Sequence, residues 1–318
     1  MTDWPNHTEA WRQWRDALGG ERMHHGWLLA GKSGLGKRDF ALAAARELVA
    51  EAGVPQPAGE HPDILVLTYG PKDDKAEKAQ ADGKPFERAR SIRIKQIRAM
   101  QRRLISRPTL GSRRAIIIDP ADDMEKAAAN ALLKSLEEPP VGTFFLLVTH
   151  RPARLLPTIR SRCRTLRFPA LADSQLAAML GDAGLPPDPA AIAAAEGSFG
   201  VALRFAAQDL APVAQVIAAL LAGGDEGFRG RGELARLIGP RADRTRIQAV
   251  LELAQSLVAR AARETGDARL RARMIDAHAA LVSLAAEAPT ANFDPGMLPF
   301  EIGSLLVAAA PASEPAHG

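Results

Sequence analysis

The chain of 318 residues is 47% hydrophobic and 25% charged, with a formal net charge of +4, as is usual for a soluble globular protein. Its single cysteine, Cys163, excludes an internal disulfide and a cysteine-based zinc site. No apolar run approaches the ~20 residues that span a bilayer, and the polar, acid-containing start is unlike a signal peptide. We therefore expect a cytoplasmic protein of two or three domains, with no membrane association and no zinc.

The first half of the sequence alternates between apolar runs and amphipathic segments. Strands are predicted over residues 24–31, 63–69, 113–120 and 143–150, with an edge strand over 164–169. Helices are predicted over 38–50, 92–105, 121–136 and 155–161. This alternation predicts an α/β fold in which helices cover both faces of a parallel sheet. Ligands of such sheets bind beyond the carboxyl ends of the strands, which is where residues 31–38, Asp119 and Thr149 fall.

The remaining segments are polar or helical. Residues 70–85 are charged and bounded by Gly and Pro, which predicts a mobile loop or an excursion from the fold. Short helices are predicted after residue 169, and longer ones around 212–222, 231–238, 243–264, 267–287 and 297–309. We expect an α/β domain over 1–169, a helical lid over 170–210, a helical collar for oligomerisation over 211–310 and a disordered tail over 311–318.

Residues 31–38 read GKSGLGKR and match the phosphate-binding pattern G-x-x-x-x-G-K-[ST] except at the last position. Gly31, Gly34 and Gly36 allow the tight curvature that points N–H groups at phosphate oxygens, and Lys37 can reach the terminal phosphates. Arg38 stands where a hydroxyl normally binds Mg²⁺. The loop is therefore either a nucleotide site, intact or vestigial, or a glycine-rich turn that binds nothing.

The strand IIID ends in Asp119 and resembles the Walker B element, whose aspartate helps to hold Mg²⁺. In active ATPases of the AAA+ type the next residue is a glutamate that polarises water, whereas here it is Pro120, which has no side-chain base. Asp122 and Asp123 are poor substitutes by position. We interpret them as favourable charges in the first turn of a helix.

Three further features stand at positions where a site residue is expected. Thr149 ends a strand, where it either senses a phosphate or bonds to a turn. Ser161-Arg162-Cys163 lies between a short helix and the edge strand, and Cys163 is interpreted as a packing residue because no His/Asn constellation supports a nucleophile. Arg204 follows GSFG in the predicted lid and is either a nucleotide contact or an exposed helix arginine.

Positive charge is clustered in two stretches. Residues 91–114 contain eight Arg or Lys and residues 150–167 contain six Arg, with no acid in either. Each stretch is either a solvated basic face or a surface for phosphate groups of DNA or of a nucleotide held by a neighbour.

Together, residues 24–37, 115–140 and 144–168 resemble the delta-prime family of bacterial DNA polymerase III clamp-loader subunits, which are AAA+ proteins. The stretch AAANALLKSLEEPP followed by Ser-Arg-Cys is characteristic of clamp loaders. The resemblance implies a pentamer with the ATPase tau/gamma subunits and delta, held by a C-terminal collar, that places a sliding clamp on primed DNA. It implies that Arg162 is an arginine finger for ATP in an adjacent subunit, and that Arg204 is a second nucleotide sensor.

The resemblance also implies that this subunit is a rigid stator that hydrolyses no ATP itself, in agreement with Arg38 and Pro120. Many relatives carry a four-cysteine zinc module, which this sequence lacks. ATP or ADP at the degenerate loop stays open. The alternatives are an ATP-hydrolysing motor subunit that relies on Lys37 and Asp119, and a stand-alone basic DNA-binding protein.

Overall fold

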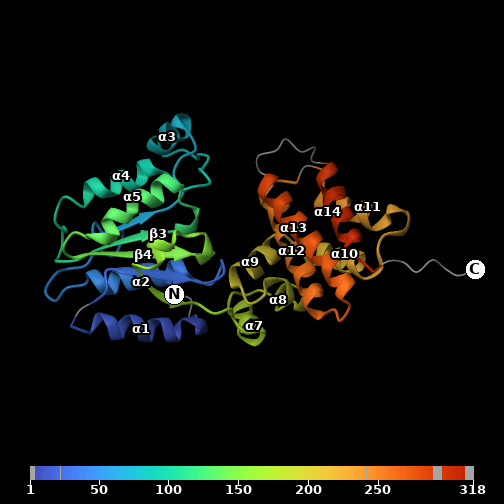
Figure 1. Ribbon diagram of the computed structural model, residues 1–318, viewed down its shortest axis with the longest axis horizontal. Coiled ribbons are helices and arrows are strands. Elements are labelled where there is room, and N and C mark those ends of the chain that lie inside the picture. Colours follow the sequence, from blue (N-terminus) through green and yellow to red (C-terminus); the bar gives the residue numbers. More distant parts are fainter. Residues whose placement is uncertain (1–3, 22, 241, 289–295, 312–318) are drawn as a thin grey trace, which may run out of the picture. The chain divides into compact units, whose positions relative to one another are not determined.

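The computed structural model describes residues 4–21, 23–240, 242–288 and 296–311 (Figure 1). It divides into two compact units, residues 1–170 and 171–318. The tail predicted over 311–318 lies outside the described residues apart from Pro311. Each unit has a hydrophobic core of its own.

The first unit is built on a five-stranded parallel sheet in the order β2-β3-β4-β1-β5. Its strands are β1 Gly26–Ala30, β2 Ile64–Leu67, β3 Arg114–Ile118, β4 Thr143–Thr149 and β5 Arg164–Arg167. The predicted α/β fold is confirmed, and so is the position of the last strand at an edge. The other edge is β2.

The helices of the first unit cover both faces of the sheet (Figure 1). They are η1 Pro5–His7, α1 Thr8–Leu18, α2 Lys37–Val49, α3 Asp74–Ala81, α4 Ile94–Arg103, η2 Ala121–Asp123, α5 Lys126–Glu137, η3 Pro152–Arg154 and α6 Pro157–Arg160. Strand residues alternate between two apolar clusters because successive side chains point to opposite faces. Ile116 and Ile118 pack with α4 and α5, whereas Ala115 and Ile117 pack with α1 and α2.

Three sequence predictions for this unit are wrong or incomplete. Residues 70–85, predicted as a mobile loop or an excursion from the fold, contain helix α3, whose first turn is capped by Asp73 accepting from the backbone N–H of Ala76 at 2.8 Å. The helix predicted from residue 121 begins at Lys126, after the separate turn η2. No helix was predicted near the N-terminus, where α1 buries Trp14 against β1.

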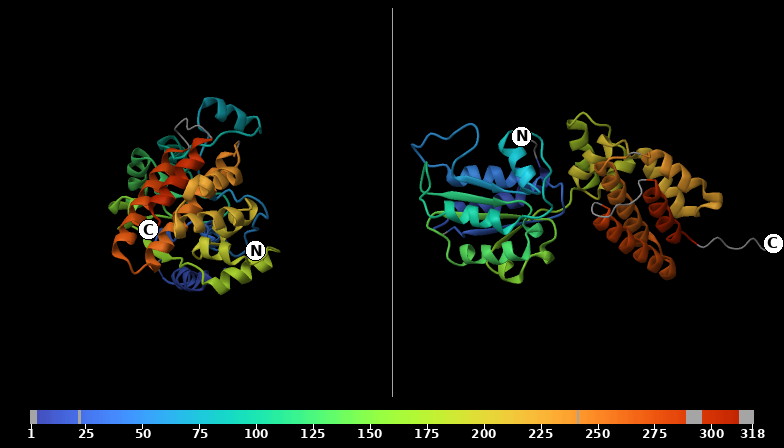
Figure 2. Two further views of the ribbon diagram at one scale, coloured as in Figure 1. Left: turned by 90° about the vertical axis from the view of Figure 1, so that its right-hand side faces the viewer. Right: turned by 90° about the horizontal axis from the view of Figure 1, so that it is seen from above.

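The second unit is entirely helical over its described residues. It contains α7 Asp173–Asp182, α8 Pro189–Ala195, α9 Phe199–Ala207, α10 Ala211–Gly223, η4 Glu226–Phe228, α11 Arg229–Ile238, α12 Arg244–Glu264, α13 Ala268–Glu287 and α14 Met297–Ala308. The long helices α12 and α13 pack along each other (Figure 2). One apolar cluster runs from α8 to α14, so the division into lid and collar stays a prediction.

No single helix among the described residues is long and apolar enough to cross a membrane. Helices α9 and α10 reach the required length and composition only together, and the chain bends by 104° between them. Phe205, Val213 and Ile217 of this pair belong to the apolar core of the second unit.

Candidate functional site

The phosphate-binding loop connects the buried strand β1 to helix α2. Gly34 and Gly36 have φ angles of 76° and 70°, in the left-handed region that glycine adopts without strain. Gly36 must also lack a side chain, because a Cβ there would lie 2.2 Å from Cε2 of Trp4. The loop therefore has the curved backbone and the following helix N-terminus that suit a phosphate group.

An N-terminal segment that the sequence analysis did not single out braces this loop. The ring of His7 stacks on that of Trp4, with centroids 5.2 Å apart. Nε2 of the buried His7 lies 2.7 Å from the carbonyl oxygen of Leu35. Since a carbonyl only accepts, that nitrogen donates. A cluster of Trp and His before the first strand was the available signal in the sequence.

Lys37 is buried at the first position of α2. Its Nζ donates to the carbonyl oxygen of Gly31 at 2.7 Å and to that of Lys32. Burial lowers the pKa of Lys37 to about 8, although Asp119 and Asp122 oppose the shift. The ammonium group of Lys37 therefore lies inside the loop and is bonded to two loop carbonyls. A bound anion would compete with these carbonyls for the N–H donors of Lys37.

Arg38 of α2 forms an ion pair with Asp119, which follows β3 at the carboxyl ends of the strands. Nη1 of Arg38 lies 3.5 Å from Oδ2 of Asp119, and the two side chains are 51% and 12% exposed. Burial raises the pKa of Asp119, and the charge of Arg38 partly offsets this. The carboxylate expected to help bind Mg²⁺ thus already has a cation beside it. The residues at this position do not fit a magnesium ion.

Asp122 and Asp123 lie in the first turn of a helix, as interpreted, but this helix is the short 3-10 helix η2 and not the long helix α5, which begins at Lys126. Asp122 accepts from the backbone N–H of His150 at 2.9 Å, and Asp123 accepts from the hydroxyl of Tyr69 at 2.6 Å. Although burial opposes it, the N–H of His150 helps to lower the pKa of Asp122. These carboxylates fasten the loops after β2 and β4 to the end of β3.

Thr149 ends β4 and is fully buried. Its Oγ1 forms no hydrogen bond of standard geometry within the described part of the chain, but its interaction with the Asp122 carboxyl helps to lower the pKa of Asp122, against the opposing effect of burial. The backbone N–H of Gly31 donates to the Thr149 carbonyl at 3.3 Å. The threonine therefore lies at the start of the phosphate-binding loop, with its buried hydroxyl interacting with Asp122.

The Ser-Arg-Cys motif follows α6, at the sheet edge that carries β5. Arg162 donates through Nη1 to the carbonyl oxygen of Thr158 at 2.9 Å and pairs through Nη2 with Oε1 of Glu137 at 2.7 Å. Its side chain is 35% exposed. Glu137 is the last residue of α5 and was not predicted as a site residue.

The comparisons with known proteins agree on one family. The family model described as "DNA polymerase III, delta subunit" matches residues 6–172, more than half of the chain. The chain belongs to the DNA polymerase III delta-subunit family, in its delta-prime branch. Its first unit is accordingly an α/β AAA+ core.

Curated relatives of this family match about half of the chain. Subunit delta-prime of Pseudomonas aeruginosa is 39% identical over 167 residues, which are 47% of this chain and 46% of that protein. Delta-prime of Bacillus subtilis is 35% identical over 162 residues, 48% of this chain and 44% of that protein. The chain spans about half the length of these relatives.

Two more distant similarities extend beyond the core. Subunit tau/gamma of Haemophilus influenzae is 31% identical over 205 residues, 62% of this chain and 29% of that protein. A gamma subunit-related protein of Thermotoga maritima matches in structure with a TM-score of 0.49 and 17% identity, over 94% of this chain and 98% of that chain. A likeness at that level supports no conclusion about function.

The sequence also singles out Ser161, Cys163 and Arg204. Ser161 donates to the carbonyl oxygen of Thr158 at 3.1 Å. Cys163 is partly buried and packs against the core, and burial raises its pKa to about 12, so it is a poor nucleophile at neutral pH. Arg204 lies on α9 in the second unit and pairs with Glu252 at 3.0 Å. Its role as a second sensor stays a prediction.

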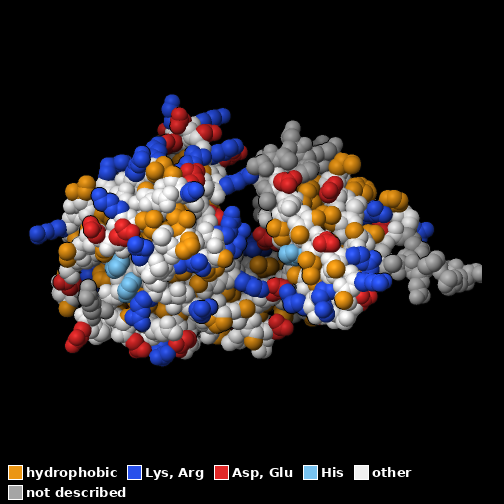
Figure 3. All heavy atoms as spheres, viewed as in Figure 1, with side chains coloured by type: hydrophobic (Ala, Val, Ile, Leu, Met, Phe, Trp, Pro, Cys, Tyr) orange, Lys and Arg blue, Asp and Glu red, His pale blue; other side chains and the backbone are white. Residues whose placement is uncertain are grey.

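Both basic stretches of this delta-prime chain contain ion-paired residues. In the second stretch, Arg151 lies 3.5 Å from Asp122 and 3.3 Å from Asp123, and Arg154 lies 3.8 Å from Asp123. In the first, Lys95 lies 2.8 Å from Glu77, Arg93 lies 3.9 Å from Glu125 and Arg114 lies 3.7 Å from Asp63. Lys and Arg side chains also gather over the face formed by α3 and α4 (Figure 3). The described residues contain no cluster of His, Cys, Asp or Glu that could hold a metal ion.

Proposed function

We propose that this chain is a stator subunit of a DNA polymerase III clamp loader and supplies Arg162 to ATP bound by an adjacent subunit. The observation that carries the proposal is the contrast between two sites. The chain's own phosphate-binding loop ends in an arginine that pairs with the metal-binding carboxylate, whereas Arg162 is partly exposed and held by two partners. A guanidinium suits the charge that develops on a transferred phosphoryl group.

The geometry around Arg162 supports a positioned finger. A guanidinium carries five N–H donors in a fixed fork. The contacts with Thr158 and Glu137 need one N–H from each terminal nitrogen, which leaves three donors for a phosphate. Arg162 can therefore keep both contacts while it binds an anion presented by another subunit. In this role the chain binds and orients, and the bonds of ATP break in the neighbouring site.

The family of the chain motivates the partners in this proposal. We propose that it assembles with ATPase subunits of the tau/gamma type and with delta in a pentamer that places a sliding clamp on primed DNA, in the cytoplasm. Its basic surfaces would then contact DNA as part of the complex. The exposed positive charge over α3 and α4 supports such a contact.

A second activity, nucleotide binding without hydrolysis, is favoured by the loop itself. Lys37 and the left-handed glycines suit phosphate groups of ATP or ADP. Arg38 disfavours Mg²⁺, and Pro120 offers no base. We propose that any nucleotide held here is bound without the metal and is not turned over.

The arginine-finger proposal is tested by reconstituting the loader with Arg162→Ala and measuring DNA-stimulated ATP turnover. We expect a large loss with Arg162→Ala and no turnover by the isolated chain. Arg160→Ala is the matched control, because Arg160 is an exposed arginine at the end of the same short helix. Equal turnover by loaders carrying the wild-type chain and Arg162→Ala would overturn the proposal.

A further inference from the structure

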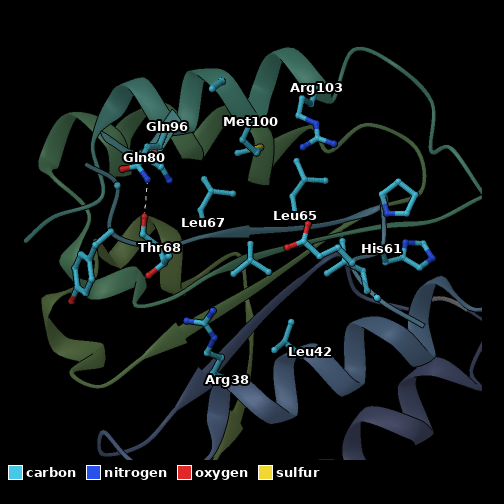
Figure 4. Close-up of a pocket in the computed structure, with 18 of the residues that line it drawn as sticks. Arg38, Leu42, His61, Leu65, Leu67, Thr68, Gln80, Gln96, Met100 and Arg103 are labelled. Atoms are coloured by element: carbon cyan, nitrogen blue, oxygen red, sulfur yellow. Dashed lines mark hydrogen bonds between the residues drawn. The ribbon is translucent and has the colours of Figure 1, made fainter. Parts of the chain in front are cut away.

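A groove of about 1000 Å³ runs along the outer edge of β2, between α2 and α4 (Figure 4). Figure 4 shows Arg38 and Leu42 reaching into it from α2, and Met100 and Arg103 from α4 on the opposite wall. Apart from Arg38 and Tyr69, its lining takes no part in the nucleotide and arginine-finger sites. The groove therefore calls for an explanation of its own.

The floor of the groove is a strand with one unpaired edge. Among the described strands β2 pairs with β3 alone. The carbonyl oxygens of Asp63 and Leu67 accept from the backbone of β3. Because the residues that bond to one neighbour alternate in a parallel strand, Ile64, Val66 and Thr68 direct their peptide groups toward the groove.

Some of these outward groups are already bonded. The Thr68 carbonyl accepts from Nε2 of Gln96 at 2.7 Å, and the Ile64 N–H donates to the turn before the strand. The N–H and C=O of Val66 and the C=O of Ile64 have no such partner in the described part of the chain. A ligand that covers these groups must therefore supply a hydrogen-bond acceptor for the N–H and donors for the two carbonyl oxygens.

The walls of the groove carry more positive than negative charge. Its charged lining residues are Arg38, Arg46, Arg103 and Glu60, and of these Arg38 is already paired with Asp119 outside the lining. Arg46 donates to the carbonyls of Pro57 and Gly59, which leaves its charge uncompensated. Arg103 forms no ion pair with any described residue. A ligand with negative charge on both sides would therefore complement the α2 wall and the α4 wall together.

Apolar surface lies between the charges. Val66 is 37% exposed on the edge strand, and Leu42 and Met100 line the walls above and below it. An extended chain directs alternate side chains to opposite faces. A peptide that alternates apolar and acidic residues would cover this surface while its carboxylates reach the arginines.

We propose that this groove binds an extended acidic segment of a partner protein, which adds to β2 as a further strand. The peptide backbone supplies the donors and acceptors that Val66 and Ile64 lack, as in other cases of strand addition. The outward groups from Ile64 to Thr68 span ~13 Å at ~3.3 Å per residue. A segment of about five or six residues matches that length.

Single-stranded nucleic acid fits the groove less well. Such ligands need aromatic side chains on which bases stack. The aromatic residues of the lining are His61, which is buried, and Tyr69, whose hydroxyl is bonded to Asp123. The carbonyl oxygens of Ile64 and Val66 would also face phosphate oxygens, which cannot donate a hydrogen bond.

The test is fluorescence anisotropy with the full chain at about 0.15 M salt. The probe is a labelled eight-residue peptide in which aspartate alternates with valine, compared with a lysine–valine counterpart and with an oligothymidylate of similar length. Arg103→Glu should weaken binding of the acidic peptide at least about fivefold. Arg102→Glu is the matched control, because Arg102 is exposed on the same helix but does not line the groove.

A second variant tests strand addition independently of charge. Val66→Pro removes an outward N–H, a change that edge strands tolerate because the bonds to the other neighbour remain. We expect it to weaken the acidic peptide while circular dichroism and the melting temperature show a folded chain. Equal effects of Arg102→Glu and Arg103→Glu, no binding of the acidic peptide at millimolar concentration, or tighter binding of oligothymidylate that depends on Arg103 would each overturn the proposal.

Discussion

Replacing Arg38 by serine should turn a metal-indifferent site into a metal-dependent one. The guanidinium lies 3.5 Å from Asp119, and its side chain is 51% exposed. Coulomb's law at an effective dielectric constant of about 20 gives roughly 5 kcal/mol for such a pair. Measured values for solvent-exposed pairs are nearer ~1 kcal/mol, and the half-exposed Arg38 belongs closer to that limit.

The substitution therefore has two expected results. The free energy of unfolding should fall by about 1 kcal/mol, because Asp119 loses its cationic partner. A hydroxyl and a carboxylate that can bind Mg²⁺ then replace the ion pair. We expect Mg²⁺ to change the affinity of the wild-type chain for ADP less than about twofold, and that of Arg38→Ser at least about tenfold, or ~1.4 kcal/mol.

Isothermal titration with ADP, in Mg²⁺ and in EDTA, measures this difference. Arg38→Lys keeps the positive charge and should stay metal-indifferent. Arg46→Ser is a second control, since Arg46 lies on the same helix and contacts carbonyl groups instead of a carboxylate. The reasoning would be refuted if the wild-type chain bound ADP at least tenfold more tightly with Mg²⁺ than without it.

Three further predictions follow from individual contacts. Because burial lowers the pKa of Lys37 to about 8, its charged fraction falls as pH rises, and the affinity for ADP measured by titration should weaken roughly tenfold between about pH 7 and pH 9. The Lys37→Arg variant is always charged and should lose this pH dependence, and an unchanged wild-type affinity over this range would contradict the prediction. Glu137→Gln should lower ATP turnover of the assembled loader about three- to tenfold by loosening Arg162, with the KM for ATP unchanged. The thermal stability of the chain should be kept because an acid at a helix C-terminus is unfavourable, and turnover at the wild-type rate would exclude a positioning role for Glu137. Arg114→Met should cost about 3–5 kcal/mol in urea unfolding, because it leaves the buried Asp63, 3.7 Å away, without its cation; a loss below about 1 kcal/mol would show that the backbone N–H groups bonded to Asp63 suffice.

The sheet could be predicted because its strands are buried on both faces and therefore read as continuous apolar runs. Helix α3 could not be recognised from hydrophobic periodicity, since Ala76 is its one buried residue and four of its other residues are charged. Its Ala, Lys, Glu and Gln residues are nevertheless good helix formers, and Asp73 caps it. Local propensity, more than hydrophobicity, carried the signal there.

The chemically important residues could be predicted, but their partners could not. The loop pattern identified Lys37 and Arg38, and the strand pattern identified Asp119. The ion pair between Arg38 and Asp119 joins positions far apart in the sequence, and only the order of the strands brings them together. The same holds for Arg162 and Glu137, whose contact depends on the packing of α5 against α6.

The central claim is that Arg162 acts on ATP in the adjacent subunit. Its most direct test is single-turnover ATP hydrolysis by a reconstituted loader in which every ATPase subunit except the neighbour of this chain has an inactivated phosphate-binding loop. We predict that Arg162→Ala lowers the rate at least about 100-fold, since a finger supplied in trans is worth ~10³–10⁵, whereas Arg160→Ala leaves it unchanged. A rate within about threefold of the wild-type value for Arg162→Ala would contradict the account.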